Sequence, residues 1–495
     1  MPSDWKRFLP FAAAVPIAAI VGTGIARGEW FWPAVALTIA LLAIFARLAP
    51  NRLPAFVLGG LIAGYFLGNR GFAQLSVSGT LPLFPAELGL AIIGTWLLWE
   101  CARERTLPIV KDVLNVSLIV WIVIGCLRIV GDLRIHGVDA VRDFAMIYYA
   151  LFFFVAQFVA SRGDTHWLRR VILTSSGALL PLFLLFEAFP DFFTYRLTIR
   201  DTPVIFFKGD LAGTFMSVGA LAWLLRHEEK RQQWGSLVMG LALAATMMST
   251  GNRASMLALA VAAVFLAAAG RTAILKKLIA AAVAGIVIIA AWTVLSGRPW
   301  SQSPLMAFYE RTASIFDFRG ERTYRAESVE QKGDNNQFRT VWWKVVIDET
   351  NSQAPLRGLG FGHDLATPFL RTYYPDSDDI FTARSPHNVF ITIYARMGVI
   401  GLAAWLVVTI AIGIGAIRSM RHLPLSETLP ACTAVALLTS ATFGVVLEGP
   451  MGAVVFWIAL GIAHGTRISS GVSRAPAIIE TPANEPSTLK FADEK

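Results

Sequence analysis

The chain has 495 residues, and its composition excludes a soluble protein of that length. Hydrophobic residues make up 55% of it and charged residues 16%, against about 25% charged residues in soluble domains. The net charge of +9 comes from clusters between apolar blocks, where basic residues orient membrane helices, so it does not indicate a nucleic-acid partner. The three cysteines lie in or beside apolar blocks, which excludes a disulfide framework and a cysteine-based metal site: Cys101, Cys126 and Cys432.

Apolar blocks of about 16 to 22 residues recur along the chain, and each can cross a bilayer as a helix. The first block has no small-residue cleavage site, so we interpret it as a span and not as a removed signal peptide. The blocks that flank Gly251 and Gly449 are joined by very short turns, which makes twelve to fourteen spans the expected range. The predicted spans are 8–26, 30–46, 53–68, 82–100, 113–131, 143–160, 170–188, 211–226, 234–250, 254–270, 277–296, 387–417, 428–447 and 450–467.

Basic residues concentrate in every second loop, and such loops face the cytoplasm. Both termini then lie in the cytoplasm, and the other loops lie on the outer, periplasmic face of a bacterial inner membrane. The loops that define the cytoplasmic side contain Lys6 and Arg7, Arg47 and Arg52, Arg103, Arg105 and Lys111, Arg162, Arg169 and Arg170, Arg226, Lys230 and Arg231, Arg271, Lys276 and Lys277, and Arg418 and Arg421.

The segment 297–386 is the one long polar stretch, and we expect it to form two helices across the outer mouth of the membrane bundle. Asp334 to Asn336 are the expected cap residues of the second helix. Strand signals are poor. The apolar faces consist of Leu305, Phe308, Thr312, Ile315 and Phe316 in the first helix, and of Phe338, Val341, Trp342 and Val345 in the second.

The predicted fold is therefore an all-α polytopic membrane protein with one large, mainly helical periplasmic loop. We divide it into a transmembrane bundle at 1–296, the loop at 297–386, further transmembrane helices at 387–467 and a tail at 468–495. The tail is rich in Pro, Ala, Ser and Glu, which is typical of disordered segments.

His387 and Asn388 stand where the polar segment meets the membrane again, at the start of an apolar block. The dipole of a helix start lowers the proton affinity of a nearby imidazole, and a neutral imidazole can act as a general base. Asn388 can cap the first helical turn or bind a sugar hydroxyl. The alternative for His387 is an ordinary interfacial residue in contact with water.

Several basic residues lie on the predicted outer side, where arginine at membrane depth opposes insertion and needs another reason. Arg253, at the outer start of a span, can bind a diphosphate with its guanidinium fork, and its alternative is a snorkelling interfacial residue. Arg339 lies three residues before Trp342, so aromatic docking would point it inward; its alternative is a solvated charge. The short outer loops also contain Arg134, Arg142, Arg196, Arg200 and Lys208.

Three further features are weaker. Gly358 to Gly362 form a glycine-rich turn without the strand–helix context of a dinucleotide site. Glu448 is an isolated carboxylate in the last outer turn that can orient His387, bind a sugar or be an ordinary interfacial acid. The acidic cluster Asp376, Asp378 and Asp379 resembles a metal site, although a solvated loop is the favoured interpretation.

These residues resemble the O-antigen ligase family, within the superfamily that also contains bacterial polysaccharide polymerases and protein O-oligosaccharyltransferases. The family pattern is His, then Asn, Ser or Gln, nine residues, Gly, two residues, and Gly, Thr or Tyr, which His387-Asn388, Gly398 and Gly401 fit without a gap. A second pattern, Arg, three residues and Leu, is fitted by Arg253 and Leu257. The stretches 336–342 and 358–362 also look like the large outer loop of the superfamily.

The resemblance implies a GT-C-like glycosyltransferase that acts in the periplasm without a metal or another cofactor. The implied donor is O-antigen on undecaprenyl diphosphate, the acceptor is a sugar hydroxyl of lipid A–core, and membrane lipids are the other partners. His387 would be the general base of an inverting displacement. The implied substrate-binding residues are Arg253, Arg339, Asn388, Arg200, Lys208 and Glu448.

Three other functions stay open. An O-antigen or capsule polymerase of the same superfamily shares the donor and differs in its acceptor. A protein O-oligosaccharyltransferase is disfavoured because no large outer C-terminal domain is present. A lipid-linked glycan transporter would need charges deep in several spans and inverted repeats, whereas here charge concentrates at the outer rim and in one outer loop.

Overall fold

The computed structural model describes residues 52–76, 84–163, 165–230, 233–297, 299–300, 303–313, 327–373 and 385–471. Within these ranges the chain is a helical bundle, and its strands are the two-residue β1 (Thr198–Ile199) and β2 (Thr202–Pro203), which pair antiparallel. The first half of the bundle comprises α3 (Leu53–Leu67), α4 (Asn69–Gln74), α5 (Pro85–Glu104), α6 (Val113–His136), α7 (Val138–Tyr148), α8 (Leu151–Ser161), α9 (Thr165–Ala188), the π-helix η2 (Phe192–Arg196) and α10 (Gly209–Glu229).

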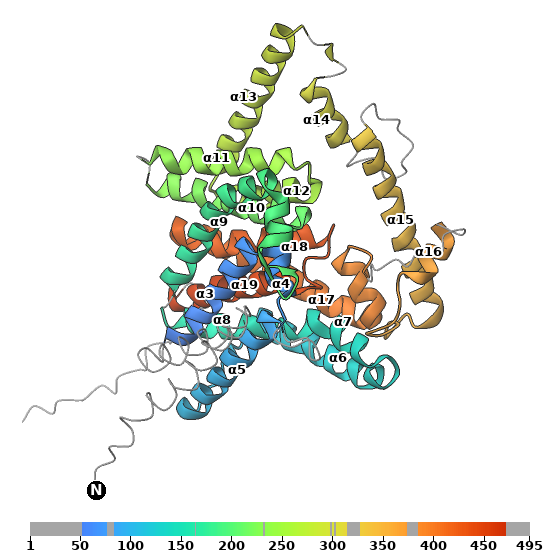
Figure 1. Ribbon diagram of the computed structural model, residues 1–495. Helices are drawn as coiled ribbons and strands as arrows, with labels where there is room; N and C mark the ends of the chain where they lie inside the picture. Colours follow the sequence, from blue (N-terminus) through green and yellow to red (C-terminus); the bar gives the residue numbers. More distant parts are fainter. Residues whose placement is uncertain are drawn as a thin grey trace, which may run out of the picture.

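The second half contains the remaining membrane helices and the helices of the polar segment. It comprises α11 (Trp234–Ser249), α12 (Arg253–Ala268), α13 (Ala273–Leu295), α14 (Pro304–Ala313), α15 (Glu327–Gln353), α16 (Thr367–Tyr373), α17 (Val389–His422), the 3₁₀-helix η4 (Leu425–Glu427), α18 (Leu429–Ala441) and α19 (Pro450–Ser469). Figure 1 shows α13 rising away from the bundle, with α14 and α15 returning toward α16 and α17.

Every span predicted within the described residues consists largely of helix, which confirms the all-α polytopic class. The span 143–160 is divided between α7 and α8, and the span 428–447 extends past the end of α18 at Ala441, so the very short turn expected at Gly449 is wrong. Among these residues, six segments are long and apolar enough to cross a membrane, and three shorter apolar helices accompany them. The predicted spans 8–26 and 30–46 and most of the tail lie outside the described residues. The total of twelve to fourteen crossings and the division into domains stay predictions.

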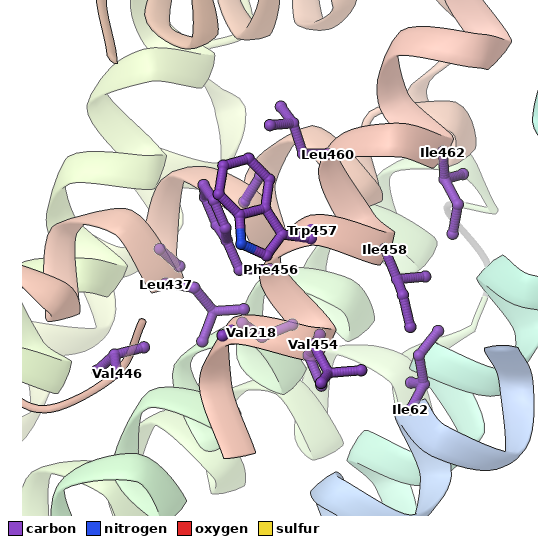
Figure 2. Packing of buried hydrophobic residues seen from close by; sticks show 14 of the residues in the cluster. Ile62, Val218, Leu437, Val446, Val454, Phe456, Trp457, Ile458, Leu460 and Ile462 are labelled. Atoms are coloured by element: carbon purple, nitrogen blue, oxygen red, sulfur yellow. The ribbon is translucent and has the colours of Figure 1, made fainter. Parts of the chain in front are cut away.

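The core forms around α19, whose side chains meet residues from several helices (Figure 2). On α19, Gly461 and Gly465 let the helix approach the backbone of α8, where Ala156 and Ala160 lie opposite them. Small residues spaced in this way are typical of close helix pairs in membranes, where packing replaces the hydrophobic driving force.

Loops that share a predicted side of the membrane also share an end of the bundle. Ion pairs join several of the basic loops to one another, and we call the end where they lie the basic end. The pairs are Arg162 with Glu104, Arg169 with Glu427 and Lys277 with Glu228.

The polar segment differs from its prediction in two respects. The described part contains three helices, α14, α15 and α16, where two were expected. Asp334 to Asn336 lie inside α15, which begins at Glu327, so their assignment as cap residues is wrong. Trp342, Val346, Leu365 and Phe369 are buried in a small separate core that fixes the helix, and this tertiary packing overrides the local cap signal.

The predicted span 387–417 required a continuous helix after His387, but the helix is broken. At Gly398 the backbone takes φ 65° and ψ −164°, which breaks α17 after nine residues. The break lies against the glycine-rich turn: the Leu359 N–H donates to Ala395 O at 2.6 Å, and the Val399 N–H donates to Pro355 O at 2.9 Å. A side chain at Gly398 would overlap the carbonyl group of Leu356.

Arg396, only 2% exposed, joins this turn to the bundle. Its guanidinium pairs with Asp143 of α7 at 2.8 Å and donates to Gly360 O at 3.0 Å and His363 O at 2.6 Å. Asp143 also accepts the Gly362 N–H at 2.8 Å. Because these polar groups satisfy one another, the turn can stay buried between α7 and α17.

We predict that Gly398→Ala destabilises the protein, because the alanine meets both an unfavourable backbone conformation and an occupied space. The expected loss is on the order of 1–3 kcal/mol, measured as a lower thermal midpoint of the full chain in detergent. Gly413→Ala on the same helix is the matched control, since the nearest atom to its added Cβ lies 4.0 Å away. Equal midpoints for the two variants would contradict the assignment.

Candidate functional site

Three helices begin close together at the end opposite the basic end. Asn252 caps α12 by accepting the Ser255 N–H at 3.1 Å, and the Ser255 hydroxyl donates to the Asp210 carbonyl at the start of α10, also at 3.1 Å. Asn388 caps α17 by accepting the N–H groups of Phe390 and Ile391 at 2.9 and 3.2 Å. Helix starts carry partial positive charge and bind anions.

His387 lies at this junction in a conformation held by its neighbours. Its φ is 59°, in the left-handed region, and its N–H donates to the Ser385 hydroxyl at 3.2 Å. On α15, the Trp343 indole donates to Pro386 O at 2.6 Å, and the Trp342 ring meets the imidazole edge-on, with centroids 5.7 Å apart. A non-glycine residue in this conformation costs free energy that its surroundings must supply, which is typical of functional positions.

The imidazole of His387 is neutral at physiological pH. Burial lowers its pKa to about 4, with help from the positive charges of Arg339 and Lys208 and against the smaller effect of Asp210. This is the direction that the sequence predicted, and its causes are burial first and the nearby cations second. Among the described residues, Nδ1 is buried without a hydrogen-bond partner.

Arg339 points into the junction because the aromatic face of α15 fixes its helix. Phe338 packs edge-on against Phe369, with centroids 4.6 Å apart, and the Arg339 guanidinium donates to Phe443 O at 2.9 Å. Burial and the charge of Arg253 lower the pKa of Arg339, whereas Asp210 raises it. The two arginines thus act on one another across the junction between α12 and α15.

Two cations of the junction lie at helix starts, which is an arrangement that favours the binding of an anion. Lys208 precedes α10 and pairs with Asp210 at 3.2 Å, and Arg253 is the first residue of α12. Positive side chains at helix starts oppose the helix dipole. Such a placement is unfavourable by itself and becomes favourable when a multiply charged anion binds between the cations.

Glu448 is connected to His387 through the hydroxyl groups of Thr392 and Ser385. Its carboxylate accepts the Thr392 hydroxyl at 2.9 Å, Thr392 lies 3.5 Å from the Ser385 hydroxyl, and Ser385 in turn accepts the His387 N–H. Burial raises the pKa of Glu448, against hydrogen bonds from Ser385 and Thr392 that lower it. The geometry favours an orienting role over direct contact with a sugar.

The structure thus brings together most of the residues that the sequence singled out. His387, Arg253, Arg339 and Lys208 share one electrostatic environment, and Asn388 and Glu448 support it. Arg200 lies exposed on the turn between β1 and β2, with φ 50°, eight residues before Lys208. Its binding role stays a prediction.

Sequence reasoning assigned no role to five participants: Asp210, Ser385, Trp343, Thr392 and the carbonyl of Phe443. Ser385 and Trp343 had a usable signal in their closeness to His387 and Arg339 along the chain. The acidic cluster at 376–379 lies outside the described residues. Within the described part, no group of three or more His, Cys, Asp or Glu side chains is placed to hold a metal ion, and metal independence stays a prediction.

Comparison with models of protein families matches residues 237–406 to the family described as O-Antigen ligase. The matched segment runs from α11 into the second half of α17, and it contains Arg253, Arg339 and His387. Lys208 and Glu448 lie outside it. A search of curated proteins finds no match.

Two replacements of Glu448 should show whether its hydrogen bonds or its negative charge stabilise the protein. Glu448→Gln keeps an oxygen for the Thr392 hydroxyl and an amide for Ser385, so its thermal midpoint should stay near that of the unaltered protein. Glu448→Ala leaves buried hydroxyl groups without partners, which costs about 1–3 kcal/mol. A Gln variant as unstable as the Ala variant would show that Glu448 stabilises the loop by its charge.

Proposed function

We propose that this chain, whose residues 237–406 match the O-antigen ligase family, transfers O-antigen from undecaprenyl diphosphate to a sugar hydroxyl of lipid A–core. The observation that carries the proposal is the placement of a neutral His387 beside the cations of Arg339 and Lys208. Transfer of a glycan from a diphosphate needs both a base and a cationic leaving-group site, and the junction supplies both.

The reaction is a single displacement at the anomeric carbon of the donor. The acceptor hydroxyl gives its proton to His387 while its oxygen forms the new glycosidic bond. The bond from the anomeric carbon to the diphosphate oxygen breaks, and the diphosphate leaves with the electron pair. Attack from the face opposite the leaving group inverts the anomeric centre.

Arg253, Arg339 and Lys208 stabilise the charge that develops on the leaving diphosphate. Fixed charges in a partly dry site need no reorganisation during the reaction, which makes them effective. With three cations and three helix starts available, the protein supplies this stabilisation from its own residues. Glu448, Ser385 and the indole of Trp343 keep the base in its place.

The location of the site follows from the membrane topology that we propose. The loops at the basic end are cytoplasmic by the positive-inside rule, so the His387 end faces the periplasm of a bacterial inner membrane. A diphosphate there sits at the headgroup level, where its isoprenoid tail can remain in the bilayer.

The proposal is tested with the purified full chain, undecaprenyl-diphosphate-linked glycan and lipid A–core. We expect a single transfer that requires lipid A–core, loss of that product in His387→Ala, and unaltered product in His422→Ala, a control at the other end of α17. Ladder-like growth of glycan without lipid A–core would identify a polymerase instead. Unaltered transfer by His387→Ala would reject the assignment of the base.

The pH dependence of transfer tests the state of His387. Since the base must be unprotonated, kcat/KM should stay level from neutral pH downward and fall through pH values near 4, the pKa of the imidazole in the unliganded protein. Bound diphosphate neutralises the cations that lower this pKa, so the fall in kcat should occur at higher pH. A fall in kcat/KM near pH 6.5, as for an ordinary histidine, would contradict this environment.

Arg253→Lys should lose transfer activity although it keeps the charge. A lysine offers a point charge in place of the planar fork that binds two phosphate oxygens, and we expect kcat/KM to fall roughly 10²-fold. Arg226→Lys, near the opposite end of α10, is the matched control and should retain activity. Full activity of Arg253→Lys would argue against a diphosphate clamp at this position.

A further inference from the structure

We infer that Asn69 is a positioning residue that sets the place of Lys208 in the anion site. The inference deepens the proposed function and rests on it for the identity of the anion. It starts from the segment 203–208, which runs from β2 to the beginning of α10 and is hydrogen-bonded through Phe206 and Lys208 to the break between α3 and α4.

Backbone hydrogen bonds hold this segment in place. The Phe206 N–H donates to Gly68 O at 3.2 Å, and Phe206 O accepts the N–H groups of Arg70 and Gly71 at 3.0 and 3.3 Å. These bonds form an isolated parallel bridge between Asn69 and Phe206. The backbone at the start of α4 thus pairs with the extended segment in the way that one strand pairs with another.

The approach is so close that glycine is required at the contact. A Cβ on Gly71 would lie 2.6 Å from Pro203 O and 2.8 Å from Phe206 N, both backbone atoms that cannot move aside. A Cβ on Gly68 would lie 3.0 Å from Val204 O. The segment is therefore fixed against the bundle before it reaches Lys208.

Asn69 makes the last contact. It is fully buried, with φ 51°, a left-handed conformation that asparagine tolerates better than most residues. Its Oδ1 accepts two backbone N–H groups, that of Lys208 and that of the adjacent Arg70, each at 3.0 Å. One amide oxygen thus connects Lys208, at the N-cap position of α10, to the start of α4.

The contact determines where the ammonium of Lys208 lies. Lys208 is the N-cap residue of α10, its Nζ is 3.2 Å from Asp210 in the same turn, and its charge acts on His387 by lowering the pKa of the imidazole. A shift of the Lys208 backbone moves this charge relative to Arg339 and to any diphosphate between them. Asn69 touches neither the donor nor the base, and it acts through Lys208.

The test is a double-mutant cycle on the full chain, because residues that act through one another are not additive. Asn69→Gly keeps the left-handed backbone and removes the side-chain acceptor, and Lys208→Met removes the ammonium. We expect Asn69→Gly to raise the donor KM roughly five- to tenfold with kcat changed less than about twofold. In the Lys208→Met background the same replacement should have no further effect on KM.

Binding of undecaprenyl diphosphate alone separates this inference from the proposed function. Its Kd should rise by a similar factor in Asn69→Gly and stay constant in Gln74→Ala, an exposed control on the same short helix. Equal effects of Asn69→Gly in both Lys208 backgrounds, or a lower thermal midpoint with unaltered Kd, would overturn the inference. Intact binding by the unaltered protein without transfer to lipid A–core would overturn the proposed function alone.

Discussion

The buried guanidinium of Arg396 holds together three segments that lie far apart in the sequence. It links Asp143 of α7 to the carbonyl groups of the glycine-rich turn, and it stands two residues before the break in α17. A buried ion pair of this kind gains little over apolar packing, but losing one partner leaves an uncompensated charge. The loop that carries Arg339, and the short helix that follows His387, both depend on this connection.

The candidate site that this connection supports is dominated by positive charge. Cations stand at the starts of α10 and α12, where the backbone already presents partial positive charge, and the one described carboxylate among them, Asp210, pairs with Lys208. Burial keeps His387 neutral by lowering its pKa, and the charges of Arg339 and Lys208 add to that effect. In the proposed function, a bound diphosphate would relieve the repulsion among the cations and also raise the pKa of the imidazole, which would couple donor binding to the activation of the acceptor.

Much of this arrangement was predictable from the sequence. Apolar periodicity predicted the helices, and the aromatic face of Phe338 and Trp342 predicted the direction of Arg339. The pairing of Arg396 with Asp143 was not predictable, because the sequence does not show which distant charges meet. The break at Gly398 was missed since an apolar run hides a residue whose φ is set by the turn packed against it. The cap at Asp334 to Asn336 failed because local signals yield to the buried tryptophan core.

The exposed surface of α13 gives the bilayer a part in the geometry of the site. Within this helix only Ile274 and Thr293 are buried, so nearly all of its apolar length is left uncovered by the described residues and is available to the lipid. A helix without packed neighbours adjusts its tilt to the thickness of the membrane around it. Because α13 leads toward α14 and α15, the helix that carries Arg339 (Figure 1), we expect hydrophobic mismatch at this edge of the protein to reach the arginine, which would make lipid chain length a variable of its chemistry.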